Sequence, residues 1–164
     1  MSNNISFVYK NGFSIISLLL LAFVTSGFCD TTCIEDNEKK KRKKIIKTAE
    51  KYIGTKYRSG GKSPRGFDCS GFCYYVMNKH NVRLGASSRA QSKQGVPVKL
   101  SKLKAGDLVF FGSKKHINHV GIVTKCTKNE LWMIHASTSR GIVEEEIYQS
   151  SYWAKRLQFG RSVL

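Results

Sequence analysis

Acidic residues are scarce in this chain of 164 residues, which has 11 aspartates and glutamates against 28 lysines and arginines and a formal net charge of +17. Such a charge favours anionic partners, namely nucleic acid, anionic lipid or an acidic cell-wall polymer. The sequence also lacks internal repeats, and its one low-complexity tract is the run "KKKRKK". A repeat architecture is therefore excluded, and the length leaves room for one domain.

Long apolar runs are also missing, whereas a membrane-spanning helix needs about 20 apolar residues. The run "FSIISLLLLAFV" has only about a dozen; it follows the single charge Lys10 and precedes the small residues "TSG". This layout predicts a signal peptide over residues 1–29 and an exported protein, periplasmic or extracellular. Its removal would lower the net charge from +17 to +16, because Lys10 is lost. Membrane contact is expected only if Cys29 is lipidated, and the bulky Phe28 before it argues against that.

The five cysteines are an odd number, so at least one is unpaired if all of them are retained. Cys69 and Cys73 are one helical turn apart, which separates their Cβ atoms by ~5–6 Å, whereas a disulfide needs ~3.5–4.5 Å. They are therefore not expected to bond to each other. The states of Cys33 and Cys126 stay open.

Metal-binding motifs are weak in this sequence. His116 and His119 form an H-x-x-H pair, but no C-x-x-C pair accompanies it. Residues three apart on a strand also point to opposite faces. We therefore expect neither a metal nor a cofactor.

The first half of the chain has helical patterns. Residues 30–41 are interpreted as a basic linker before a domain over residues 42–164. Apolar residues then recur at helical spacing from Ile45 to Ile53, which predicts a helix with Asp36 or Asn37 as its cap and Gly54 as its end. A short helix is also predicted around "ASSRAQSKQG".

A second helix is predicted to begin at Cys69, directly after the loop "SGGKSPRG". Asp68 is a typical N-cap residue, so Cys69 becomes the first helical residue. The cysteine shares one face with the apolar residues Phe72, Cys73, Val76 and Met77. The thiol therefore points toward whatever this helix packs against.

The second half of the chain has short apolar runs rich in β-branched and aromatic residues, separated by polar turns. They occupy residues 106–112, 119–125, 130–136 and 141–147, and "AKRLQFGRSVL" can add a terminal strand. Helices followed by closely spaced strands indicate an α+β fold, with N-terminal helices packed on an antiparallel sheet of about five strands.

Two of the only four histidines lie at facing strand ends. His119 starts one predicted strand and His135 ends the next. If these strands form a hairpin, the two imidazoles meet at one end of the sheet, facing the helix that begins with the thiol.

This arrangement suits nucleophilic catalysis. A free thiol with a pKa near ~8.5 is only a few per cent ionised at neutral pH. A helix N-terminus and a neighbouring imidazolium both stabilise the thiolate, so Cys69 is expected to ionise there. The hypothesis is Cys69 as nucleophile, His119 as general base and His135 as the residue that orients it, with the N–H of Cys69 as an oxyanion donor.

Five blocks, "GTKYRSGGKSPRGFDCSGF", "SSRAQ", "LKAGDLVFFG", "HVGIV" and "MIHAS", resemble in order the signature blocks of NlpC-like cell-wall peptidases, compact relatives of papain-type cysteine peptidases. The resemblance covers residues 42–164. It implies a papain-like fold and hydrolysis of peptide bonds in peptidoglycan stems, often the bond between D-glutamyl and a diamino acid. It also implies the triad Cys69, His119 and His135.

The same resemblance implies further site residues. Tyr57 matches a tyrosine near the oxyanion and the substrate, and Asp68 and Ser70 match residues that hold the substrate's N-terminal end. Ser59 replaces a common aromatic residue, and Gly85 and Ala86 replace the usual proline and arginine. These departures lie at expected substrate-lining positions and concern specificity.

The expected partners are peptidoglycan stem peptides and an anionic wall polymer. The alternatives are a peptidoglycan amidase, since the same triad serves several acyl transfers, and a non-catalytic wall-binding module of the same fold. The competent residues at all three triad positions oppose the binding module. Nucleic acid is suggested by charge alone, and the export signal opposes it.

Overall fold

The structure, a computed structural model, describes residues 31–113 and 115–164. The predicted signal peptide (1–29) and the lipidation site Cys29 lie outside the described residues. Among the helices of the described part, none has the length and apolar character needed to cross a bilayer.

The helices are followed by a strand-rich second half, as the sequence predicts. The helical elements are α1 (Thr31–Glu50), α2 (Cys69–Asn78), α3 (Ser88–Gln91), η1 (Leu100–Lys102) and α4 (Ser151–Ala154). The strands are β1 (Lys62–Ser63), β2 (Gly66–Phe67), β3 (Val96–Val98), β4 (Leu108–Ser113), β5 (His116–Cys126), β6 (Leu131–Ser137), β7 (Gly141–Glu146) and β8 (Leu157–Ser162).

The main sheet has six strands in the order β3-β8-β4-β5-β6-β7, and every neighbouring pair is antiparallel. The predicted α+β class with an antiparallel sheet is confirmed. The sequence analysis missed β3, which pairs with β8 at the sheet edge. This strand is short and contains Pro97, which is tolerated at an edge but weakens the sequence signal.

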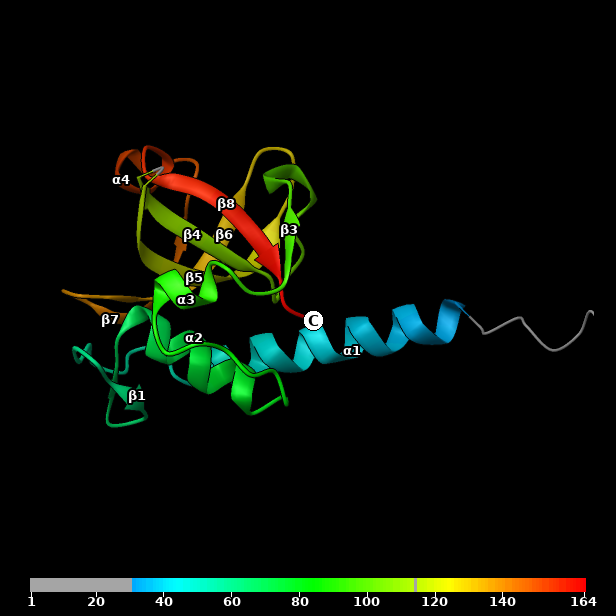
Figure 1. Ribbon diagram of the computed structural model, residues 1–164, viewed down its shortest axis with the longest axis horizontal. Helices are drawn as coiled ribbons and strands as arrows, with labels where there is room; N and C mark the ends of the chain where they lie inside the picture. Colours follow the sequence, from blue (N-terminus) through cyan, green and yellow to red (C-terminus); the bar gives the residue numbers. More distant parts are fainter. Residues whose placement is uncertain (1–30, 114) are drawn as a thin grey trace, which may run out of the picture.

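Both faces of the sheet carry apolar clusters. Figure 1 shows α1 and α2 on one side of the sheet, where Phe72 and Val76 pack in the same cluster as Val120. Phe111 and Met133 belong to a second cluster, which Trp153 flanks. The two clusters alternate along the strands because successive side chains point to opposite faces.

The segment expected to be a linker is helical. Helix α1 begins at Thr31, so residues 31–41 are its first turns and neither Asp36 nor Asn37 caps it. Lysine, arginine and glutamate are good helix formers, and the lysine run therefore favours the helix as well as a solvated linker. The helix ends at Glu50, and a turn leads on to Gly54, which has a φ of 88°.

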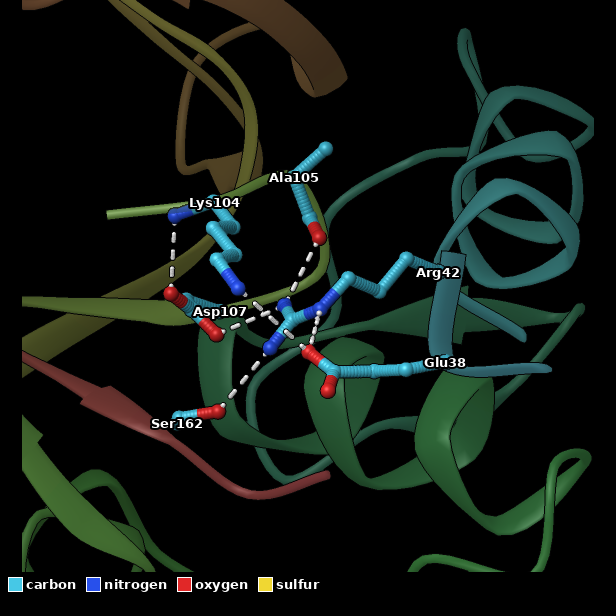
Figure 2. Close-up of polar contacts among 6 residues, drawn as sticks. All are labelled: Glu38, Arg42, Lys104, Ala105, Asp107 and Ser162. Atoms are coloured by element: carbon cyan, nitrogen blue, oxygen red, sulfur yellow. Dashed lines mark hydrogen bonds and ion pairs between the residues drawn. The ribbon is translucent and has the colours of Figure 1, made fainter. Parts of the chain in front are cut away.

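Arg42 attaches α1 to the sheet. Its guanidinium donates to Oδ1 of Asp107 at 2.8 Å, to the carbonyl O of Ala105 at 2.9 Å and to Oγ of Ser162 at 3.1 Å (Figure 2). Glu38, one turn earlier, accepts from Nε of the same guanidinium at 2.8 Å. Arg42 therefore points inward, unlike the exposed lysines beside it.

Candidate active site

Cys69 is the first residue of α2, as predicted. Asp68 caps the helix, and its Oδ1 accepts from the backbone N–H of Gly71 at 2.6 Å. Gly71 packs tightly on the loop before the helix, because a Cβ there would lie 1.9 Å from the carbonyl O of Gly61. This contact allows only glycine and holds the start of the helix against that loop.

The sulfur of Cys69 lies against strand β5. Its Sγ is 4.0 Å from the carbonyl O of Asn118, and the nearby backbone N–H of Val120 acts to lower the pKa of the thiol. These two backbone groups flank His119 on both sides. The thiol and the His119 side chain line one cavity of about 540 Å³.

The predicted contact between the two histidines is confirmed. Nε2 of His119 is 3.0 Å from Nδ1 of His135. The pairing of β5 with β6 as antiparallel neighbours produces this contact. Since Nε2 of His119 is engaged, Nδ1 is the ring nitrogen left for a proton from the thiol.

The imidazoles project from the sheet face opposite to the one expected. His119 stacks on Trp153 with ring centroids 4.7 Å apart, and Phe111 lies 5.9 Å from it. Both neighbours belong to or flank the second cluster, whereas α2 packs on the first. The thiol therefore shares the cavity with His119, whereas His135 is buried behind His119 and does not line that cavity.

Burial determines the protonation states of the Cys69 thiol and the His119 imidazole. It raises the pKa of the Cys69 thiol, the charge of Asp68 adds to this, and the backbone N–H groups of Val120, Ser70 and Cys69 offset only part. Burial, followed by the neighbouring His135, lowers the pKa of His119 to about 3. The free site therefore holds a neutral thiol and a neutral imidazole, in contrast to the expected ionised thiol.

The predicted substrate-binding residues occupy different places. Tyr57 lines the cavity with Cys69, and burial raises the pKa of its hydroxyl, which stays a neutral donor. Ser70 is buried and donates to Oδ1 of Asp68 at 3.0 Å. The same Oδ1 caps α2. Asp68 and Ser70 thus hold the helix start together, and substrate binding by them stays a prediction.

The H-x-x-H pair does not converge. Nδ1 of His116 lies 2.8 Å from Nη2 of Arg89, while His119 contacts His135. The two imidazoles thus have separate partners.

Comparison with known proteins identifies the chain. The model of the NlpC/P60 family matches residues 54–161. The chain belongs to the NlpC/P60 family. This confirms the resemblance read from the five sequence blocks.

Relatives within the NlpC/P60 family share about a third of their aligned residues with this chain. The probable endopeptidase NlpC of Escherichia coli (strain K12) is 37% identical over 117 residues, which cover 70% of this chain and 73% of that protein. The gamma-DL-glutamyl hydrolase of Bacillus subtilis (strain 168) is 33% identical over 111 residues, 67% of this chain but only 27% of that protein. The crystal structure of the NlpC/p60 domain of the peptidoglycan hydrolase SagA is 34% identical, has a TM-score of 0.62, and covers 74% of this chain and 97% of its own.

Two residues of this NlpC/P60 site were missed from the sequence. Glu145 on β7 contacts His135, and Trp153 on α4 covers His119. Glu145 is one of three consecutive glutamates, and no local pattern distinguishes it from its neighbours. The sequence "YW" offers an aromatic signal, but not the strand on which it packs.

Proposed function

We propose that the protein is an exported cysteine endopeptidase that hydrolyses peptide bonds in peptidoglycan stem peptides. Cys69 is the nucleophile, His119 the general base and His135 the residue that orients it. The observation that carries this proposal is the thiol at the start of α2 in one cavity with His119, whose Nε2 is held by His135. The names of the relatives support the same reaction class.

The reaction begins when Sγ of Cys69 attacks the carbonyl carbon of the scissile bond. The thiol proton passes to Nδ1 of His119, and the oxyanion that forms accepts from the N–H of Cys69, which has no helical partner at a first helical position. Tyr57 supplies a second donor. The imidazolium then protonates the leaving amine, which leaves a thioester that water hydrolyses with His119 again as base.

The proposed scissile bond joins D-glutamyl to a diamino acid. The name of the gamma-DL-glutamyl hydrolase supports this choice. A γ-linked glutamyl residue keeps a free α-carboxylate, and Arg156 and Arg140 line the cavity. The Arg156 guanidinium lies 3.8 Å from the Tyr152 ring centroid and donates to its carbonyl O at 3.1 Å. This fixed cation can bind a carboxylate.

Mass analysis of muropeptides after digestion tests the reaction. New free amines on stem peptides are expected from the wild type, and Cys69→Ala should abolish them without loss of folding. Cys126→Ala is a matched control, because this cysteine lies outside the cavity. Undiminished hydrolysis by Cys69→Ala contradicts the proposal, and release of whole stems from the sugar indicates the amidase alternative.

The proposed second partner is an anionic wall polymer, bound by α1. Lysines 39, 40, 43, 44 and 47 are exposed on this helix, while Arg42 is buried and attaches it to the sheet. In Figure 1 the N-terminal half of α1, which includes Lys39 and Lys40, extends beyond the sheet. A fixed row of cations favours a polyanion.

Sedimentation with purified wall sacculi tests this adhesion. Binding is expected at low salt and should be lost near 1 M salt, where the Debye length falls from about 10 Å to about 3 Å. Replacing the five exposed lysines of α1 by glutamine should weaken binding and leave muropeptide hydrolysis unchanged. Binding that salt does not affect would exclude the electrostatic mechanism.

A further inference from the structure

Glu145 lies at the far end of a chain of side chains that leads to the thiol. Its Oε2 accepts from Nε2 of His135 at 2.5 Å and from the indole Nε1 of Trp153 at 3.1 Å. Its Oε1 forms an ion pair with Arg140. Both side chains that contact His119 from this side, His135 and Trp153, are thus held by one carboxylate.

The neighbouring glutamates have other partners. Glu144 is exposed and accepts from Oγ1 of Thr124 at 2.6 Å. Glu146 accepts from the backbone N–H of Leu131 at 3.1 Å. The pairing of Glu145 with Met133 places its side chain on the sheet face of the histidines.

We infer that Glu145 is a positioning residue that sets the tautomer of His119 and stabilises its charged form, extending the triad to Cys69, His119, His135 and Glu145. This inference rests on the proposed function, because it assigns a role in the same thiol chemistry.

The tautomer follows from the direction of the hydrogen bonds. A carboxylate only accepts, so Nε2 of His135 must carry its proton toward Glu145. In neutral His135, Nδ1 is then a lone pair that accepts from Nε2–H of His119. Nδ1 of His119 is thereby left unprotonated, as a base for the thiol requires.

The negative charge of Glu145 becomes important when Cys69 transfers its proton to His119. Transfer from Sγ of Cys69 to Nδ1 of His119 creates an imidazolium in a half-buried, poorly solvated site, where an isolated cation is unfavourable. The negative carboxylate beyond His135 attracts this cation. The proton stays on His119, and Glu145 gains none, as in other triads whose acidic member orients a histidine.

Other charged or titratable groups also face this pair. Asp68 lies at the start of α2, Arg140 precedes β7, and Tyr57 and Arg156 line the cavity. Burial opposes ionisation of Glu145, but hydrogen bonds from Arg140, His135 and Trp153 lower its pKa below the ordinary value. The carboxylate is therefore anionic at neutral pH.

The test compares Glu145→Ala, Glu145→Gln and, as a matched control, Glu144→Gln in the full chain. Glu145→Ala should lower kcat for muropeptide hydrolysis by about 10- to 100-fold with a small change in KM, because base catalysis contributes about 10²–10⁴-fold. Glu145→Gln keeps an acceptor but no charge and should fall between Glu145→Ala and wild type. Glu144→Gln should match the wild type.

Alkylation by iodoacetamide, measured at Cys69 by peptide mass analysis, gives a readout that needs no substrate. In the wild type, the neutral thiol and imidazole exchange with a minor thiolate–imidazolium form, whose fraction does not depend on pH between the two pKa values, so alkylation should show a plateau near neutral pH. Glu145→Ala should lower this plateau about tenfold, and the rates should converge at alkaline pH above the raised pKa of the Cys69 thiol, where the thiolate no longer needs the imidazolium.

An unchanged plateau in Glu145→Ala, with native circular dichroism, would overturn the role of Glu145. If Glu145→Ala does not fold, alkylation of Glu145→Gln tests whether the charge of Glu145 is needed. A plateau as high in Glu145→Gln as in the wild type would likewise overturn the inference. A lowered plateau in a protein that cleaves no muropeptide would support Glu145 while refuting the proposed function.

Discussion

Acid should unfold this protein partly through one histidine. Burial, with the neighbouring His135, lowers the pKa of His119 from 6.5 to about 3 in the folded protein, while the unfolded chain keeps the ordinary value. Below pH 6.5 the unfolded chain therefore binds a proton that the folded protein refuses. Stability from this source is complete above pH 6.5 and is lost as the pH falls toward 3.

The magnitude follows from the two pKa values of His119. Each pH unit between these two pKa values removes about 1.4 kcal/mol from the free energy of unfolding. Acidification from pH 7 to pH 4.5 should thus cost about 2.5 kcal/mol through this residue alone. Such a loss is a substantial part of the total stability of a small domain, which is about 5–15 kcal/mol.

Urea unfolding at both pH values, followed by circular dichroism, measures this loss. His119→Gln removes the titrating group, so its free energy of unfolding should fall by about 2.5 kcal/mol less than that of the wild type. His116→Gln, at an exposed histidine outside the pair, should follow the wild type. Equal acid losses in His119→Gln and the wild type would refute a neutral imidazole at this position.

Substitutions at three further positions test other parts of the structure. Arg42→Ala leaves Asp107, which is 1% exposed, without its guanidinium and should cost about 3–5 kcal/mol in thermal or urea unfolding; a cost below about 1 kcal/mol would contradict the anchor. His135→Ala should lower kcat by about 10²-fold or more. His135→Asn should lower kcat less, because the amide oxygen of asparagine can still accept from His119. Equal kcat values in the two variants would contradict the proposal that His135 orients His119. Trp153→Ala exposes His119, so its pKa should rise and the acid limb of the kcat/KM profile should move to higher pH; an unmoved limb would show that Trp153 does not bury the base.

The start of α2 could be predicted because a helix cap depends on residues three apart. Asp68 and Gly71 lie in one short segment, and their contact forms wherever that segment becomes helical. The contact of His119 with His135 was predictable for a similar reason. Adjacent strands joined by a short turn are antiparallel neighbours, so the start of one meets the end of the next.

The start of α1 could not be predicted with the same success. A lysine run suits both an exposed helix and a solvated linker, and local sequence does not distinguish them. Contacts with distant residues attach the helix to the domain, above all Arg42 with Asp107. Edge strand β3 was missed because it is short, contains Pro97 and pairs with β8, which lies far along the chain.

The sequence by itself determined the helix that begins at Cys69, the α+β class and the pairing of two histidines, because these depend on spacing along the chain. Only the tertiary structure decided that Glu145, and not Glu144 or Glu146, reaches His135, because sheet register selects the residue. It also decided that thiol and imidazole are neutral in the free site. Protonation depends on burial and on charges from distant segments, which no local pattern contains.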